Sequence, residues 1–134
     1  MIRHAERLNG VKQVLVDVVR GAAEALPFDV LVIEGLRSQA RQAELWAQGR
    51  TTPGKQVTWI QHSKHQDGEA VDLAPLLPNG AIDWSTFSKF DAIHGAMVNA
   101  GAAHGVGIRW GADWDRDGKP RERGETDSPH FEIV

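Results

Sequence analysis

The chain has 134 residues, which is the size of one ordinary domain and too short for two separate hydrophobic cores. Hydrophobic residues make up 41% and charged residues 25%, as in a soluble globular protein. A net charge of -3 without a cluster of lysine or arginine argues against nucleic acid as a partner. The absence of cysteine excludes disulfides and thiolate metal sites, so a zinc ion would need histidine and carboxylate ligands.

The amino-terminal segment alternates charged and apolar residues and lacks the hydrophobic core of a secretory signal peptide. We therefore expect synthesis in the cytoplasm, with release to a later site of action by a separate route. No apolar run approaches the roughly 20 residues that span a bilayer, so we expect no stable membrane association.

The first half of the chain predicts helices and short strands in alternation. Apolar residues at spacings of three and four predict a helix over Leu8–Leu26, although Asn9-Gly10 can delay its start. After Pro27, a β-branched run predicts a buried strand over 28–33. Ser38 fits the N-cap of a second helix through about Gln48, and residues 57–60 suit a short strand.

The next strand begins at Ala70, after a break at Gly68. Alternation places Asp72 on a face with small alanines, while Val71 and Leu73 pack into the core. Residues 78–80 then predict a turn.

A third helix is predicted from a cap at Asp83 to about Ala103. Its apolar members keep helical spacing and are Trp84, Phe87, Phe90, Ile93 and Met97. We interpret His94 and His104 on this helix as structural residues rather than ligands.

The carboxyl-terminal part predicts a strand over Val106–Trp110, a polar loop over Gly111–Asp127 and a last strand over Pro129–Val134. In that last strand His130 and Glu132 share one face. The order of elements favours an α+β fold, with helices covering one side of a mostly antiparallel sheet.

Three residues in this pattern have the chemistry of a zinc site. A catalytic zinc ion usually takes three protein ligands and keeps a fourth position for water, and His65, Asp72 and His130 would supply such a set. Asp127, just before His130, could accept the proton of that water. Spacing alone leaves other interpretations open, because the histidines could be surface or core residues and Asp127 could cap a turn.

Four segments resemble one known enzyme family. Ser63–Asp72 reads Ser-x-His-x-x-Gly-x-Ala-x-Asp. This resembles the signature of zinc peptidases that include D-alanyl-D-alanine dipeptidases and carboxypeptidases and the phage L-alanyl-D-glutamate endopeptidases. Glu34–Ser38 resembles the family's Gly-x-Arg-Ser segment, and Asp127-x-x-His130 resembles its spacing between base and ligand. Arg109–Trp114 resembles the phage endolysin branch.

The resemblance implies a single zinc peptidase domain over residues 1–134 with a hedgehog/DD-peptidase-like fold. It implies His65, Asp72 and His130 as zinc ligands and Asp127 as the catalytic base. Arg37 would hold a substrate carbonyl or carboxylate, and Ser63 would contact substrate beside the metal. In the dipeptidase branch the base is a glutamate, so the shorter Asp127 favours the endolysin branch.

The implied function is zinc-dependent cleavage of the L-alanyl-D-glutamate bond in peptidoglycan stem peptides, by a monomeric phage or prophage endolysin that acts on the cell wall. Cleavage of D-alanyl-D-alanine is the alternative activity, and a non-catalytic wall-binding module is the alternative from another class.

A second group of carboxylates precedes Gly118. Asp113, Asp115 and Asp117 have the spacing of a calcium loop, although the closing glutamate is missing because Gly124 stands in its place. The other interpretation is a solvated acidic turn whose charges are balanced by nearby basic residues.

Overall fold

The computed structural model describes residues 1–35, 47, 67–113, 116, 118, 120–121 and 127–134. The helix predicted over 38–48, apart from residue 47, and the strand predicted over 57–60 lie outside these residues. The elements in chain order are β1 (Ile2–Arg3), the 3-10 helix η1 (Ala5–Leu8), α1 (Gln13–Glu24), β2 (Val30–Glu34), β3 (Ala70–Pro75), α3 (Phe87–Ala103), β4 (Ile108–Gly111) and β5 (Asp127–Ile133).

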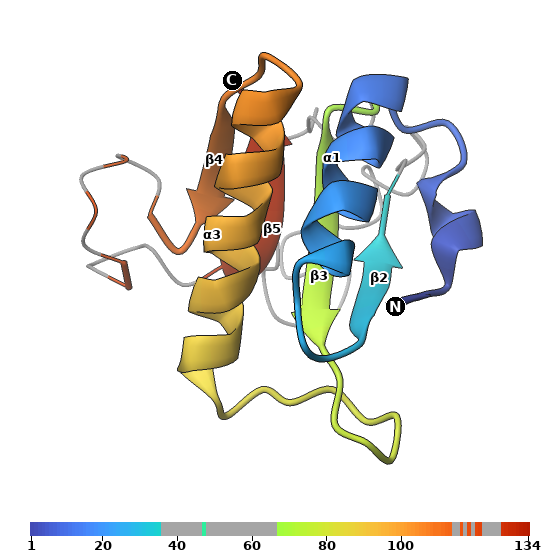
Figure 1. Cartoon of the computed structure of the whole chain (residues 1–134), viewed down its shortest axis with the longest axis vertical. Coiled ribbons are helices and arrows are strands. Elements are labelled where there is room, and N and C mark those ends of the chain that lie inside the picture. Colours follow the sequence, from blue (N-terminus) through green and yellow to red (C-terminus); the bar gives the residue numbers. More distant parts are fainter. Residues whose placement is uncertain (36–46, 48–66, 114–115, 117, 119, 122–126) are drawn as a thin grey trace.

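The strands form one sheet in the order β1-β2-β3-β5-β4 (Figure 1). The sheet is mixed rather than purely antiparallel, because β1 pairs with β2 in parallel while the other neighbouring pairs are antiparallel. β5 follows β4 in the sequence but lies between β3 and β4. The sheet thus brings residues near position 72 next to residues near position 130.

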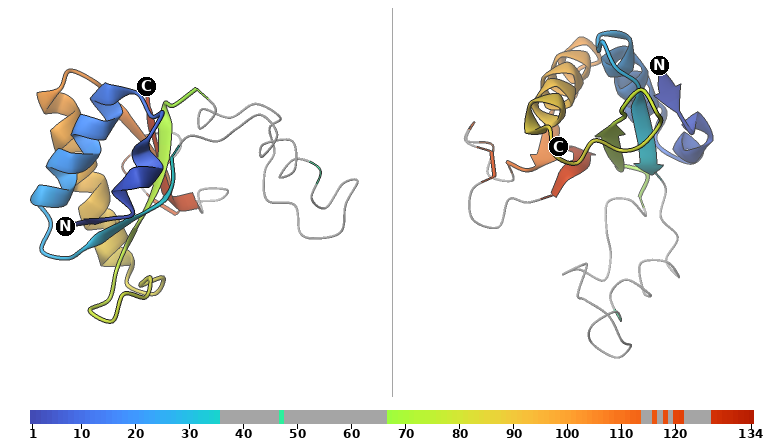
Figure 2. Two further views of the ribbon diagram at one scale, coloured as in Figure 1. Left: turned by 90° about the vertical axis from the view of Figure 1, so that its right-hand side faces the viewer. Right: turned by 90° about the horizontal axis from the view of Figure 1, so that it is seen from below.

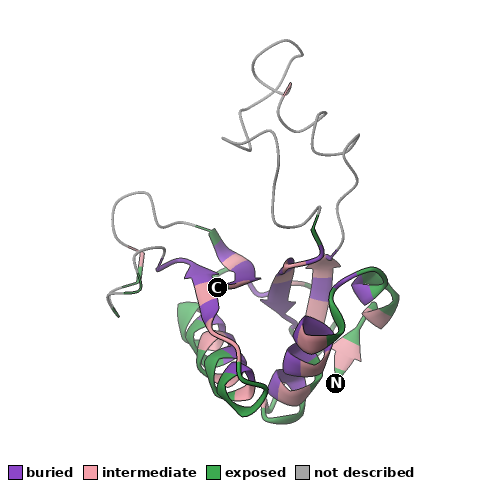
Figure 3. Cartoon of the chain, turned by 90° about the horizontal axis from the view of Figure 1, so that it is seen from above, coloured by how far each residue is buried: buried purple, intermediate pink, exposed green. Residues whose placement is uncertain are grey.

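Both α1 and α3 cover the same face of the sheet, as expected (Figure 2). Buried residues fill the space between the helices and the sheet, whereas the outer sides of the helices are exposed (Figure 3). The largest fully buried side chains belong to this layer and are Phe90, Phe131, Leu15, Leu73, Ile93 and Met97. The opposite face of the sheet carries the polar residues described below.

Helix α1 is shorter than the predicted Leu8–Leu26. Leu8 ends η1, and Gly10 then adopts a φ of 83°, so the α-helix begins only at Gln13. Its apolar face is buried as the spacing predicts, with Leu15 and Val18 at 0% exposure. In the described part of the chain, no helix has the length and apolar character needed to cross a membrane.

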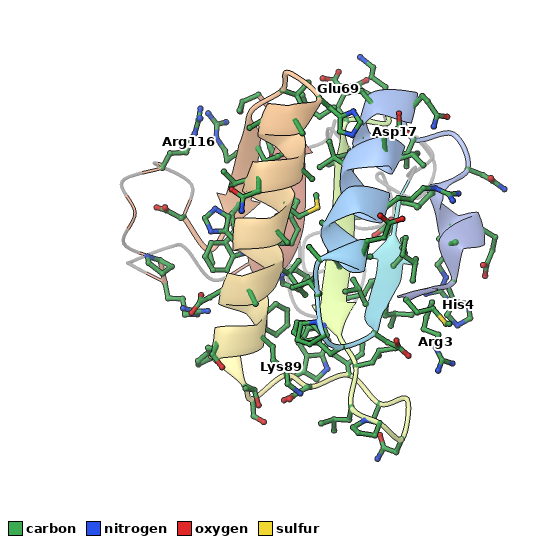
Figure 4. The ribbon with its side chains drawn as sticks, in the orientation of Figure 1. Arg3, His4, Asp17, Glu69, Lys89 and Arg116 are labelled. Carbon is green, nitrogen blue, oxygen red and sulfur yellow. The ribbon has the colours of Figure 1, made fainter. Side chains whose placement is uncertain are left out.

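Helix α3 begins at Phe87 and not directly after Asp83. The Asp83 carboxylate accepts hydrogen bonds from the Ser85 and Thr86 amides at 3.2 and 3.1 Å, which closes a turn ahead of the helix. Lys89, at the lower end of α3 in Figure 4, lies 3.0 Å from the same carboxylate.

The turn ahead of α3 changes the environment of two residues that fit the predicted helical spacing. Trp84 lies before the helix and Phe87 is its first residue, and both are exposed, at 56% and 54%. The remaining predicted members of the helix, Phe90, Ile93 and Met97, are buried.

Candidate metal centre

Asp72 and His130 are direct neighbours on adjacent strands. The β3–β5 register pairs Asp72 with His130, and the residues beside them, Val71 and Phe131, are fully buried toward the helices. Because side chains alternate along a strand, Asp72 and His130 point to the sheet face opposite α1 and α3. His130 Nδ1 lies 3.4 Å from Asp72 Oδ1.

The spacing of these two atoms fits a shared zinc ion. Ligand atoms about 2.0–2.2 Å from zinc at the corners of a tetrahedron lie roughly 3.3–3.6 Å apart, and the observed 3.4 Å falls in that interval. An imidazole nitrogen and a carboxylate oxygen are also donors that zinc accepts. Among the described residues no group of three such side chains could hold a metal, and the third predicted ligand, His65, lies outside them.

His130 is buried, with 8% of its surface exposed. Burial by itself lowers the pKa of His130, but contacts with the Asp72 and Glu132 carboxylates, and the charge of Asp127, outweigh burial and raise that pKa to about 9. The imidazole therefore sits in a strongly negative environment. Such an environment attracts a cation, either a proton on the ring or a metal ion beside it.

Glu132 is a site residue that sequence reasoning missed. Its Oε1 lies 2.9 Å from His130 Nε2, and its Oε2 lies 3.7 Å from a guanidinium nitrogen of Arg109. Alternation along the last strand already placed Glu132 on the same face as His130, and this pattern could have identified it as a site residue. Its partner Arg109 lies on β4, so their contact could be found only from the order of the strands in the sheet.

Asp127 begins β5 and is exposed. It pairs with Gly111 at an irregularity of the β4–β5 register. One residue further on, the indole Nε1–H of Trp110 donates a 2.6 Å hydrogen bond to the carbonyl oxygen of Ser128. The backbone around Asp127 is therefore fixed from β4, while its side chain stays accessible.

Gly68 makes the turn that the sequence predicted. It has a φ of 71°, and its carbonyl oxygen accepts a 2.9 Å hydrogen bond from the Lys12 amide. This contact ties the start of β3 to the start of α1. The predicted site residues Arg37, Ser63 and His65 lie outside the described residues.

The predicted calcium loop is described only in part, because Asp115 and Asp117 are outside the described residues. Asp113 is buried, and its Oδ2 accepts a 3.0 Å hydrogen bond from the Gly118 amide. Gly118 has a φ of 81°, as a sharp loop turn requires. Arg116 projects from this loop in Figure 4, beside the strand β4.

The arrangement defines a class of protein. The chain shares its fold with the D,D-dipeptidase VanXYg, solved in complex with a D-Ala-D-Ala phosphinate analogue. The TM-score is 0.58 and the identity is 20%, over 92% of this chain and 50% of that one. This likeness shows that the protein has the DD-peptidase-like fold, in which a histidine and a carboxylate are paired on the sheet face opposite α1 and α3.

The chain belongs to the phage L-alanyl-D-glutamate peptidase family, whose family model matches residues 2–134. It is 36% identical to the L-alanyl-D-glutamate peptidase of Escherichia phage T5, over 96% of this chain and 93% of the relative. The crystal structure of the Serratia marcescens L-Ala D-Glu endopeptidase ChiX aligns with a TM-score of 0.78 and 30% identity, over 100% of this chain and 90% of that one. These findings confirm the family that the four segments predicted.

Proposed function

We propose that this protein is a zinc-dependent endopeptidase that cleaves the L-alanyl-D-glutamate bond of peptidoglycan stem peptides. The observation that carries the proposal is the pairing of Asp72 with His130, with their ligand atoms 3.4 Å apart on the sheet face opposite α1 and α3. Membership in a family of L-alanyl-D-glutamate peptidases supports the choice of substrate.

In this proposal His65, Asp72 and His130 hold the zinc ion. When bound, zinc would polarise the scissile carbonyl group and lower the pKa of a water molecule to about 7. Asp127 takes a proton from the attacking water and returns it to the leaving amine. The exposure of Asp127 at the start of β5, close enough for its charge to raise the pKa of His130, supports this role.

Arg37 and Ser63 contact the substrate in this proposal. The guanidinium of Arg37 donates hydrogen bonds to the oxygen that becomes negative in the transition state, and the hydroxyl of Ser63 binds the peptide beside the metal. Both assignments come from the sequence motifs.

The activity is tested by digesting purified peptidoglycan and analysing the products by mass spectrometry. New amino-terminal D-glutamate is the expected product. Release of D-alanine or of its dipeptide would instead support the alternative carboxypeptidase or dipeptidase activity.

The role of the metal is tested by chelation and by loss of one ligand. We expect removal of zinc to abolish hydrolysis and added zinc to restore it, and His65→Ala to abolish hydrolysis and wall lysis. His104→Ala is the matched control, because His104 is an exposed histidine at the end of α3. Unchanged lysis after His65→Ala, or after chelation, would contradict the zinc mechanism, whereas a zinc-loaded wild-type protein that binds the wall without hydrolysing it would support the wall-binding module.

We also propose that the protein acts on the cell wall as a monomeric phage or prophage endolysin after release from the cytoplasm. Its substrate partner is the stem peptide itself. Size-exclusion chromatography with light scattering tests the monomer. Expression in a host with and without a pore-forming partner tests the release step, since lysis is expected only with the pore.

The loop over Asp113, Asp115 and Asp117 is proposed as a calcium site. The hydrogen bond from the Gly118 amide to Asp113 Oδ2 supports it, since this contact curls the loop back on its first carboxylate. Calcium should raise the melting temperature of the protein but not that of Asp113→Asn. If calcium changes the melting temperatures of both proteins equally, the loop is a solvated acidic turn and not a calcium site.

A further inference from the structure

Two rows of polar residues cross the sheet face opposite α1 and α3. In one row Glu34, Asp72 and His130 are neighbours from β2, β3 and β5. In the next row Glu132 pairs with Ala70 on one side and with Arg109 on the other. Asp72 and His130 belong to the proposed metal site, whereas Glu132 and Arg109 have no role in the mechanism so far.

Glu132 is buried, with 7% of its surface exposed. A buried carboxylate is costly unless it is paired and hydrogen-bonded. Its two oxygens are divided between two partners, Oε1 toward His130 Nε2 at 2.9 Å and Oε2 toward Arg109 at 3.7 Å. The carboxylate therefore connects a cation on β4 to the imidazole on its own strand.

The contact with His130 determines which ring nitrogen faces Asp72. An ionised carboxylate can only accept a hydrogen bond, so His130 Nε2 must carry the donated hydrogen. The other nitrogen, Nδ1, lies 3.4 Å from Asp72 Oδ1, and a metal ion bound there would replace the proton on Nδ1 and take its lone pair. Metal-binding histidines commonly donate their second N–H to a carboxylate, which fixes the ring and increases its basicity.

We propose that Glu132, held by Arg109, is a positioning residue that fixes the His130 ring so that Nδ1 faces the metal. The proposal rests on the proposed zinc function of Asp72 and His130. The Arg109 side chain is 36% exposed, so water still reaches its guanidinium. The guanidinium at the same time orients the Glu132 carboxylate.

Two substitutions separate this role from a merely structural one. Glu132→Gln keeps an oxygen that can accept from His130 Nε2 but loses the ion pair with Arg109. Glu132→Ala loses both contacts. If Glu132 only joined β4 to β5 through Arg109, the two variants would behave alike.

The readouts are the zinc dissociation constant, measured by competition with a chelator, and the visible absorption spectrum after substitution with Co²⁺, which reports ligand geometry. We expect Glu132→Ala to weaken zinc binding about 10- to 100-fold and to change the Co²⁺ spectrum. Glu132→Gln should keep the wild-type spectrum and most of the affinity. Arg109→Ala should shift the affinity in the same direction as Glu132→Ala but by less.

Asp91→Asn is the matched control, because Asp91 is also a carboxylate paired with an arginine, 2.7 Å from Arg121, but on helix α3. It should leave zinc affinity and the spectrum unchanged. If Glu132→Ala fails to fold, the near-isosteric Glu132→Gln and Arg109→Ala still test the proposal, since Glu132→Gln must then retain the spectrum.

The positioning role is wrong if Glu132→Ala binds zinc and Co²⁺ as the wild type does, or if Glu132→Gln loses as much as Glu132→Ala. Failure of the proposed function looks different, because the wild-type protein would then bind no stoichiometric zinc or would show no peptidase activity when loaded.

Discussion

Gly111 lies directly opposite Asp127 in the β4–β5 register, and the backbone leaves no room for a methyl group between them. A Cβ atom at Gly111 would collide with the carbonyl oxygen of Asp127 and would come within 2.8 Å of the Asp127 Cβ. The position of the proposed catalytic base therefore depends on the absence of a side chain on the neighbouring strand.

We expect Gly111→Ala to displace Asp127. The crowding should lower the free energy of unfolding by about 1–3 kcal/mol, and the displaced carboxylate should lower kcat/KM by about 10- to 100-fold. Urea unfolding and hydrolysis of a stem peptide measure the two effects. A control is Gly95→Ala in α3, where an added Cβ meets nothing within 4 Å. That variant should gain about 0.4–1 kcal/mol of stability and keep its activity.

Gly68 combines a left-handed backbone with a close contact. Its φ is 71°, and a Cβ atom there would lie 2.7 Å from the carbonyl oxygen of Gly10. Gly80 has a similar φ of 88° but open space around it. Gly80→Ala should therefore cost about 1–2 kcal/mol from the backbone alone, and Gly68→Ala should cost clearly more. Equal losses of stability in urea unfolding would mean that the chain near Gly10 moves aside without cost.

His94 makes stability depend on pH. Its ring stacks on the Trp110 ring with centroids 4.4 Å apart. Burial lowers the pKa of His94 below its ordinary value of 6.5, and the charge of Asp91 only partly opposes this. The unfolded chain then binds the proton more readily than the folded one, so the contribution of His94 to stability is fully present above pH 6.5 and falls as the pH drops below it.

We expect His94→Phe to reduce this loss of stability between about pH 7.5 and pH 5. Urea unfolding at several pH values gives the slope. His104→Gln, which changes an exposed histidine, should keep the wild-type slope. A His94→Phe protein with an unchanged slope would show that other groups cause the pH dependence.

Asp83 should stabilise the turn ahead of α3 only while it is ionised. The contact with Lys89, followed by the hydrogen bonds from Thr86, holds the pKa of Asp83 well below its usual 3.8. Its contribution is therefore present above pH 3.8 and is lost as the pH falls toward the lowered pKa of the folded state.

We expect the melting temperature to decrease from wild type to Asp83→Asn to Asp83→Ala. Asn keeps an oxygen for the Ser85 and Thr86 amides but loses the ion pair with Lys89, whereas Ala loses both. Thermal denaturation at pH 7 measures the melting temperatures of the three proteins. If Asp83→Asn is as unstable as Asp83→Ala, the stabilisation by Asp83 comes from its charge and not from its hydrogen bonds to the amides.

The faces of the two central strands could be predicted from the sequence because alternation is a local property. Residues 70–75 and 129–134 each showed which side chains share a face, and Asp72 and His130 do lie on the face opposite α1 and α3. Their adjacency rested on the family resemblance and not on alternation. The order β3-β5-β4 depends on pairing between distant segments, which no local pattern reports.

The start of α3, the short strand β1 and the contact of Glu132 with Arg109 could not be predicted from the spacing of apolar residues. Trp84 and Phe87 fit helical spacing, but the Asp83 side chain bonds the amides that follow it and delays the helix, which leaves both rings exposed. β1 has only two residues, too few for an alternating pattern. Glu132 was on the predicted face, but its pairing with Arg109 requires the neighbouring strand.

The place of β5 between β3 and β4 also has a consequence for folding kinetics. β2 and β3 can pair, and β1 can join them, while Asp72 still has no His130 beside it. Contacts between segments far apart in sequence carry a larger loop-closure entropy and form slowly. The ability to bind metal should therefore appear late in refolding, with the insertion of β5, and a stopped-flow metal indicator would follow that step directly.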